Sequence, residues 1–185
     1  METLKTVQTL AKIGRIFSKI IFIFSLIGGI ACVAGIVSFA LIPDGIKIGG
    51  VTIRGLVEKS AEVSTGTLYT VMAIGVVLCA GEAVLSKIAE RYFKCELADG
   101  TPFTFDGAKS LIRLGVCTIC IPLGTSVVAA IVYAIMKHSF EGVADLNFSD
   151  YVSAGLGVMF IVTGVICRYG AQLREKSEGN ALAEE

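Results

Sequence analysis

Long hydrophobic stretches alternate with shorter polar ones along the chain. Four stretches, residues 20–42, 67–86, 114–136 and 151–167, carry almost no charged side chains. Each is close to the roughly 20 apolar residues that an α-helix needs to cross a bilayer. The pattern therefore predicts an all-α integral membrane protein, a four-transmembrane-helix bundle in the lipid bilayer that forms a single domain over residues 1–185.

The first 19 residues combine basic and apolar positions at helical spacing. Lys5, Lys12 and Lys19 are seven residues apart, while large aliphatic and aromatic residues recur three or four apart. This arrangement predicts an amphipathic N-terminal helix that lies at the lipid headgroups and leads into the first span. An arm dedicated to binding a partner is the alternative.

The connection between the first two hydrophobic stretches, residues 43–66, contains a short alternating pattern. Isoleucine and valine alternate with other residues on both sides of Gly49-Gly50. β-Branched residues around Gly-Gly predict a two-residue β-hairpin, because glycine adopts the positive φ that such turns need. We expect this short β-hairpin loop on the extracytoplasmic side.

Residues 87–113 form a polar hinge between two hydrophobic halves of similar design. We expect the second helix to continue into this polar hinge and to break where glycine and proline interrupt it. Thr104 or Asp106 can cap the helix that follows. The break is expected at Asp99, Gly100 and Pro102, and the turn places Phe103 on the membrane or against the bundle.

Small residues recur at helical spacing inside the spans. Glycine lets helix backbones approach closely in a membrane, where no hydrophobic effect drives association. Packing inside the bundle is the main interpretation, and a homo-oligomer seam is the alternative. The glycines singled out as helix-packing residues are Gly28, Gly35, Gly157 and Gly164.

Composition supports the membrane assignment, and the distribution of charge adds an orientation. Mean hydropathy is +0.77, and 54% of residues are hydrophobic while 17% are charged, which is too apolar for a water-soluble domain. The formal net charge is 0. However, 12 of the 16 Lys and Arg residues lie in the N-terminal segment, the polar hinge and the C-terminal segment. The positive-inside rule therefore predicts that both termini and the hinge are cytoplasmic.

Glu82 is the acidic residue inside the hydrophobic stretches. A carboxylate at depth in a bilayer costs a few kcal/mol unless it is paired, protonated or near water, so such residues often mark an ion or proton path. Glu82 lies close to the inner boundary, and this position favours a structural ion pair. The candidate partners are Lys87, Arg113 and Arg168.

The six cysteines raise one enzymatic alternative. Cys117 and Cys120 have the spacing of a redox motif, which would suit a membrane protein that exchanges electrons with thiols. None of the six lies in a predicted outer loop, where such a protein meets the oxidising compartment. A thiol redox role is thus a minor alternative, and buried cysteines usually act as small apolar residues.

Two short motifs resemble a known family. The sequence from Asp99 to Thr104, DGTPFT, runs into an inner helix and the third span, and YGAQL, residues 169–173, follows the fourth span. In this layout the chain resembles the DUF2975 family of bacterial inner-membrane proteins of unknown function. The resemblance implies a four-span protein, and it implies that the gene often lies beside one for a small helix-turn-helix regulator. It implies no activity, and the tail lacks the aspartate-rich ending of many members.

The sequence thus predicts a non-catalytic accessory or regulatory membrane protein. It would present a basic cytoplasmic surface to a protein partner, with no cofactor and no direct contact with nucleic acid. A small transporter or channel subunit that uses Glu82 is the alternative from another functional class.

Overall fold

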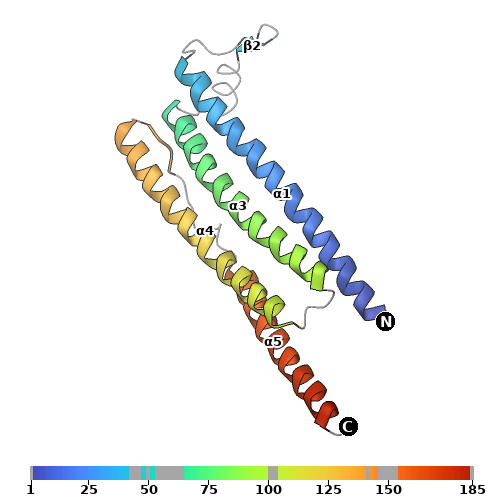
Figure 1. The fold of residues 1–185 in the computed structure, drawn as a ribbon. Helices are drawn as coiled ribbons and strands as arrows, with labels where there is room; N and C mark the ends of the chain where they lie inside the picture. Colours follow the sequence, from blue (N-terminus) through green and yellow to red (C-terminus); the bar gives the residue numbers. More distant parts are fainter. Residues whose placement is uncertain are drawn as a thin grey trace. The chain divides into compact units, whose positions relative to one another are not determined.

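Four long helices account for most of the chain in the computed structural model (Figure 1), which describes residues 2–41, 47–48, 51–52, 65–99, 104–140, 142–145 and 154–183. All four are long and apolar enough to cross a membrane. The protein is thus a multi-pass helical membrane protein, as the hydrophobic pattern predicts. The helices are α1 (Glu2–Leu41), α3 (Thr65–Asp99), α4 (Phe105–Ser139) and α5 (Ala154–Ala183).

Two short strands are described between α1 and α3. β1 (Lys47–Ile48) and β2 (Val51–Thr52) pair antiparallel, with Lys47 opposite Thr52 and Ile48 opposite Val51. The Gly49-Gly50 turn proposed from the sequence lies outside the described residues. The extracytoplasmic β-hairpin loop therefore stays a prediction.

The polar hinge is largely helical. α3 continues to Asp99 and α4 begins at Phe105, so only a short connection separates them. Thr104 caps α4: its Oγ1 accepts a hydrogen bond from the amide of Gly107 at 3.0 Å, and its carbonyl accepts one from the amide of Ala108 at 2.9 Å. Thr104 is thus one of the two caps that the sequence predicts. Gly100, Pro102 and Phe103 lie outside the described residues.

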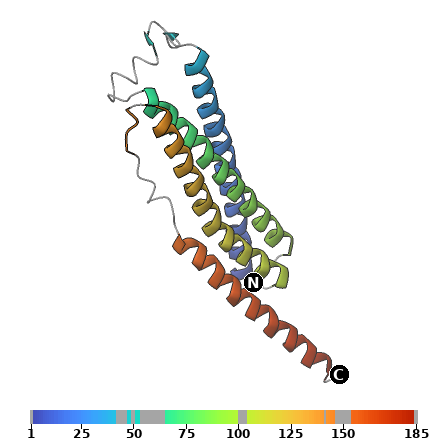
Figure 2. The ribbon, with the colours of Figure 1, turned by 90° about the vertical axis from the view of Figure 1, so that its left-hand side faces the viewer.

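The contacts within the chain group into two compact units. The first unit consists of Met1–Phe22, Val84–Pro122 and Val152–Glu185, and the second of Ile23–Ala83 and Leu123–Tyr151. α1, α3 and α4 each contribute one segment to each unit. α5 is a single continuous helix (Figure 2), and all of it belongs to the first unit.

Burial in the helices is inverted relative to a water-soluble protein. Small side chains such as Ala11, Ser18 and Ser25 are buried, while Phe17 and Phe24 on the same helix are 62% and 69% exposed. Exposed large apolar side chains are expected where the solvent is lipid, and small residues are expected where helices touch. The predicted amphipathic N-terminal segment is the first part of α1 and continues into the span without a break. Its position at the lipid headgroups stays a prediction.

In the first unit, α5 packs antiparallel along the N-terminal half of α4. A Cβ atom added to Gly115 would lie 2.8 Å from the carbonyl oxygen of Gly157, and one added to Gly157 would lie 2.9 Å from that of Gly115. About two turns further along α5, Gly164 lies close to the backbone of Ala108 and Ile112. The C-terminal part of the predicted fourth span therefore lies beside α4 residues of the polar hinge, a register that hydropathy does not reveal.

Candidate functional site

Glu82 lies on the second unit's segment of α3, beside α1. The hydroxyl of Ser25 donates a hydrogen bond to Glu82 Oε2 at 3.3 Å. Ser25 is 5% exposed, whereas Glu82 is exposed. A neutral hydroxyl is thus the described partner of this carboxylate, and the bond joins the two helices.

The three basic residues proposed as partners of Glu82 have other surroundings. Lys87 is bonded to Glu90 at 3.0 Å, and Arg113 and Arg168 are exposed on α4 and α5. The ion pairs found between described residues do not include Glu82. Its pairing with one of these basic residues stays a prediction.

Glu90 is the centre of a charged cluster in the first unit that sequence reasoning missed. Its two carboxylate oxygens lie 3.7 Å from Lys19 Nζ and 3.0 Å from Lys87 Nζ. Lys87 Nζ also lies 4.3 Å from the ring centre of Phe22, a cation–π contact. Arg15 acts electrostatically on the same carboxylate. The sequence could have revealed only part of this cluster. Lys87 and Glu90 are three residues apart on one helix, whereas Arg15, Lys19 and Phe22 are distant from them in the chain.

A second missed group, Tyr92 and Glu96, lies on the same helix within the next two turns. Tyr92 is 8% exposed, and its hydroxyl interacts with the carboxylate of Glu96. Tyr92 also belongs to the buried cluster of the first unit, together with Ala108, Leu111, Leu114 and Cys167. The spacing of four residues between tyrosine and glutamate is the signal that could have revealed this pair.

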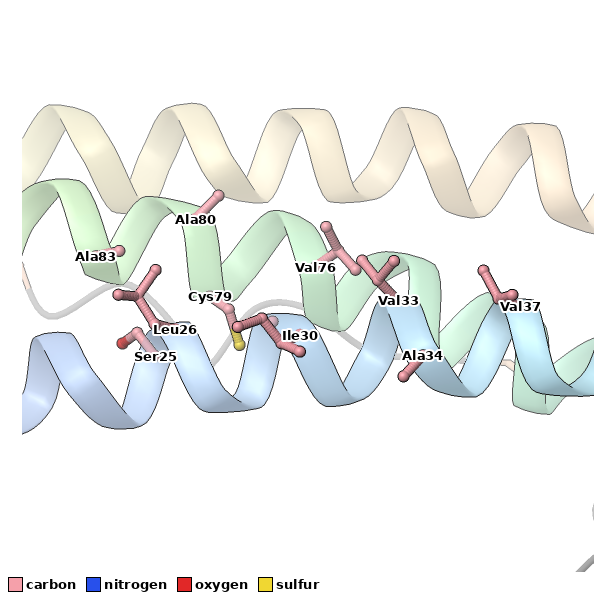
Figure 3. A pocket seen from close by; sticks show the side chains of 11 residues that line it. Ser25, Leu26, Ile30, Val33, Ala34, Val37, Val76, Cys79, Ala80 and Ala83 are labelled. Atoms are coloured by element: carbon pink, nitrogen blue, oxygen red, sulfur yellow. The ribbon is translucent and has the colours of Figure 1, made fainter.

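An open apolar groove runs along α1 and α3 in the second unit. It has a volume of about 490 Å³ (Figure 3). Leu26, Ile30 and Val33 from α1 lie beside Val76, Cys79 and Ala80 from α3. Its lining contains no charged side chain. Such a groove can accept a hydrocarbon chain or an apolar helix face, and it offers no group for acid–base chemistry.

All four glycines proposed for helix packing lie at close approaches between helices. A Cβ atom on Gly28 would lie 3.2 Å from Cys79 Sγ, and one on Gly35 would lie 2.8 Å from Met72 Sδ. Gly157 and Gly164 face α4, as described above. In the α1–α3 contact a side chain fills the space above each glycine, whereas in the α4–α5 contact backbone lies against backbone.

The cysteines are free thiols. Cys117 is half-buried and Cys120 is exposed, and both lie on α4. Within the part of the chain that the structure describes, no three His, Cys, Asp or Glu side chains gather into a group that could hold a metal ion.

A small polar contact follows α4 in the second unit. Asp145 Oδ1 accepts hydrogen bonds from Lys137 Nζ at 2.6 Å and from the hydroxyl of Tyr133 at 3.1 Å. These two bonds and the charge of Lys137 hold the pKa of Asp145 below its usual value. The group is exposed, so its part in stability is small.

Comparison with known proteins adds no family. No family model, no curated protein sequence and no solved structure matches the chain. Membership of the DUF2975 family therefore stays a prediction.

Proposed function

We propose that this chain is a non-catalytic accessory protein of the cell membrane that presents a basic cytoplasmic surface to a protein partner. Four apolar helices anchor it, and the exposed basic side chains of the polar hinge form the surface. Arg91, Lys94 and Lys109 are exposed on α3 and α4. They are free to meet a partner without first breaking a buried contact.

The unequal division of charge between the two units is the observation that carries this proposal. The first unit contains 12 of the 16 basic residues and 9 of the 16 acidic ones, a net charge of +3. The second contains 4 basic and 7 acidic residues, a net charge of −3. Basic residues near membrane spans are retained in the cytoplasm, so the termini and the hinge are assigned to that side. The connection with the β strands is then extracytoplasmic.

Affinity purification of the tagged chain from cross-linked native membranes tests the proposal. The variant Arg91→Gln, Lys94→Gln, Lys109→Gln removes three charges from the hinge. The matched control Lys47→Gln, Arg54→Gln, Lys59→Gln removes three from the opposite connection. We expect a protein that is recovered with the wild type and the control and lost with the hinge variant. Recovery of the same proteins with all three chains would contradict the basic-surface proposal.

The alternative is a small transporter or channel subunit, and the Ser25–Glu82 hydrogen bond favours it. That bond places an acidic group and a hydroxyl together beside an otherwise uncharged part of α1. The neighbouring groove is apolar, which supports packing or lipid contact in preference to a polar path.

A further inference from the structure

We propose that Arg15, Lys19 and Lys87 form a binding site for the phosphate of an anionic phospholipid in the first unit. This inference concerns a lipid and goes beyond the proposed protein partner. Either one can fail without the other.

The charges of the cluster do not balance. One carboxylate, Glu90, stands against three cations: Lys19 and Lys87 in direct ion pairs, and Arg15 through its field. The cluster therefore keeps a net charge of about +2 after its internal pairing. A second anion close to it would be favourable.

Exposure separates the anion from the cations. The side chain of Glu90 is 17% exposed, whereas those of Lys19 and Lys87 are 52% and 55% exposed. The carboxylate is thus largely covered, whereas about half of each lysine side chain remains accessible. An ammonium has three N–H donors, so each lysine can bond Glu90 and a phosphate oxygen together.

The guanidinium of Arg15 supplies an unmet donor. Its Nε atom is buried and has no hydrogen-bond partner among the described residues. A buried donor without a partner is destabilising, because it has lost its hydrogen bonds to water. A phosphate oxygen that displaces the groups covering this nitrogen would satisfy the donor.

The position of the cluster along α1 identifies the anion as a lipid headgroup. Lys19 is followed directly by residues 20–41, which carry no charge and extend for about 33 Å at 1.5 Å per residue. That length matches the hydrocarbon thickness of a bilayer, about 30 Å. Ile20 and Ile21 are exposed. Lys19 therefore lies at the boundary between the hydrocarbon core of the bilayer and the lipid phosphate groups.

Native mass spectrometry of the full chain from mixed micelles tests the site. The micelles contain equal amounts of phosphatidylglycerol and phosphatidylcholine with identical acyl chains. We expect the wild type to retain phosphatidylglycerol preferentially. Lys19→Gln, Lys87→Gln should reduce that preference by about thirty-fold, because each basic residue near an anionic surface contributes about fivefold. Lys109→Gln, Lys176→Gln removes the same charge from exposed positions on other helices and should leave the preference unchanged.

Two further measurements separate this site from simpler explanations. Glu90→Gln removes the internal anion and should strengthen the preference for phosphatidylglycerol. A circular dichroism melt checks that this variant still folds. An unchanged or weakened preference in the folded variant would overturn the site. Inorganic phosphate at millimolar concentration should not displace the lipid, because the acyl chains add affinity. Displacement of the lipid by phosphate would overturn the lipid site in favour of a site for free anions. An equal loss of preference in the Lys19/Lys87 and Lys109/Lys176 variants would show that net charge alone causes the binding, and it would also overturn the site.

Discussion

Glu82 and Ser25 show how a single hydrogen bond changes the interpretation of a membrane carboxylate. An ion pair would make Glu82 sensitive to loss of charge. A hydroxyl partner makes it sensitive to loss of the acceptor, because glutamine keeps a carbonyl oxygen that Ser25 can still reach.

Glu82→Gln is therefore expected to change the free energy of unfolding by less than about 1 kcal/mol, whereas Ser25→Ala should lower it by about 1 kcal/mol. Chemical denaturation in detergent micelles measures both. The double variant should lose no more than Ser25→Ala alone. A loss of about 3 kcal/mol in Glu82→Gln would indicate a buried ion pair instead.

The Glu82→Gln variant also decides between a membrane anchor and a transporter. In liposomes with an imposed potential, we expect no proton or cation flux from the wild type above protein-free liposomes. A robust flux that disappears in Glu82→Gln while the melting temperature stays the same would overturn the accessory-protein proposal and support the transporter.

Asp145 allows a prediction of pH dependence with a defined sign. Lys137 and Tyr133 hold the pKa of Asp145 below its ordinary value, so folding favours the ionised form. Its small stabilisation is complete above the unfolded pKa, about 4, and is lost as the pH falls through the lower folded pKa. The melting temperature of Asp145→Asn should be slightly below that of the wild type at pH 7. The difference should vanish in acid; a difference that grows in acid would contradict the sign.

At the scale of helices, the α4–α5 contact depends on two glycines that face each other. Gly157→Ala would put a methyl group 2.9 Å from the carbonyl oxygen of Gly115 and against Ile119, and backbone cannot move aside as a side chain can. We expect the free energy of unfolding to fall by about 1–3 kcal/mol.

Gly155 gives a matched control two residues away on the same helix. An added Cβ there meets nothing within 4 Å. Gly155→Ala should be neutral or stabilise by up to about 1 kcal/mol, because alanine favours helix over glycine. Equal effects of the two substitutions in thermal melts would show that α5 does not pack on α4 in this register.

The sequence predicted which segments form helices, but it did not predict how the helices align. Each span is long and apolar, and Thr104 precedes a helical pattern, so these features follow from local chemistry. The pairing of Gly157 with Gly115 depends on distant parts of the chain, and several glycine spacings would serve equally well.

The acidic residues illustrate the same limit. Glu82 was singled out because it interrupts a hydrophobic stretch, a signal visible in one dimension. Glu90 sits among other charges in the polar hinge, and only its spacing of three residues from Lys87 pointed to a contact. Its contact with Lys19 joins residues 71 positions apart. Tyr92 and Glu96 were within reach of sequence reasoning, since four residues separate them.

For the whole molecule, helix length and charge together define how much of the protein leaves the bilayer. α1 has 40 residues and α3 and α4 have 35 each, about 60 Å and 52 Å at 1.5 Å per residue. A bilayer core is about 30 Å thick. A large part of each helix must therefore lie among headgroups or in water, and the basic residues mark which part.

Labelling with a membrane-impermeant maleimide tests this orientation. Cys95 is exposed on the basic part of α3, and a cysteine introduced as Gly50→Cys lies in the connection that contains the strands. With the other five cysteines replaced by serine or alanine, intact cells should label Gly50→Cys and leave Cys95 unlabelled. Permeabilised cells should label both, which controls for reactivity. Because the first unit carries a net charge of +3 and the second −3, the opposite labelling on intact cells would place +3 on the outside. That outcome would break the positive-inside rule and overturn the cytoplasmic surface on which the proposed function depends.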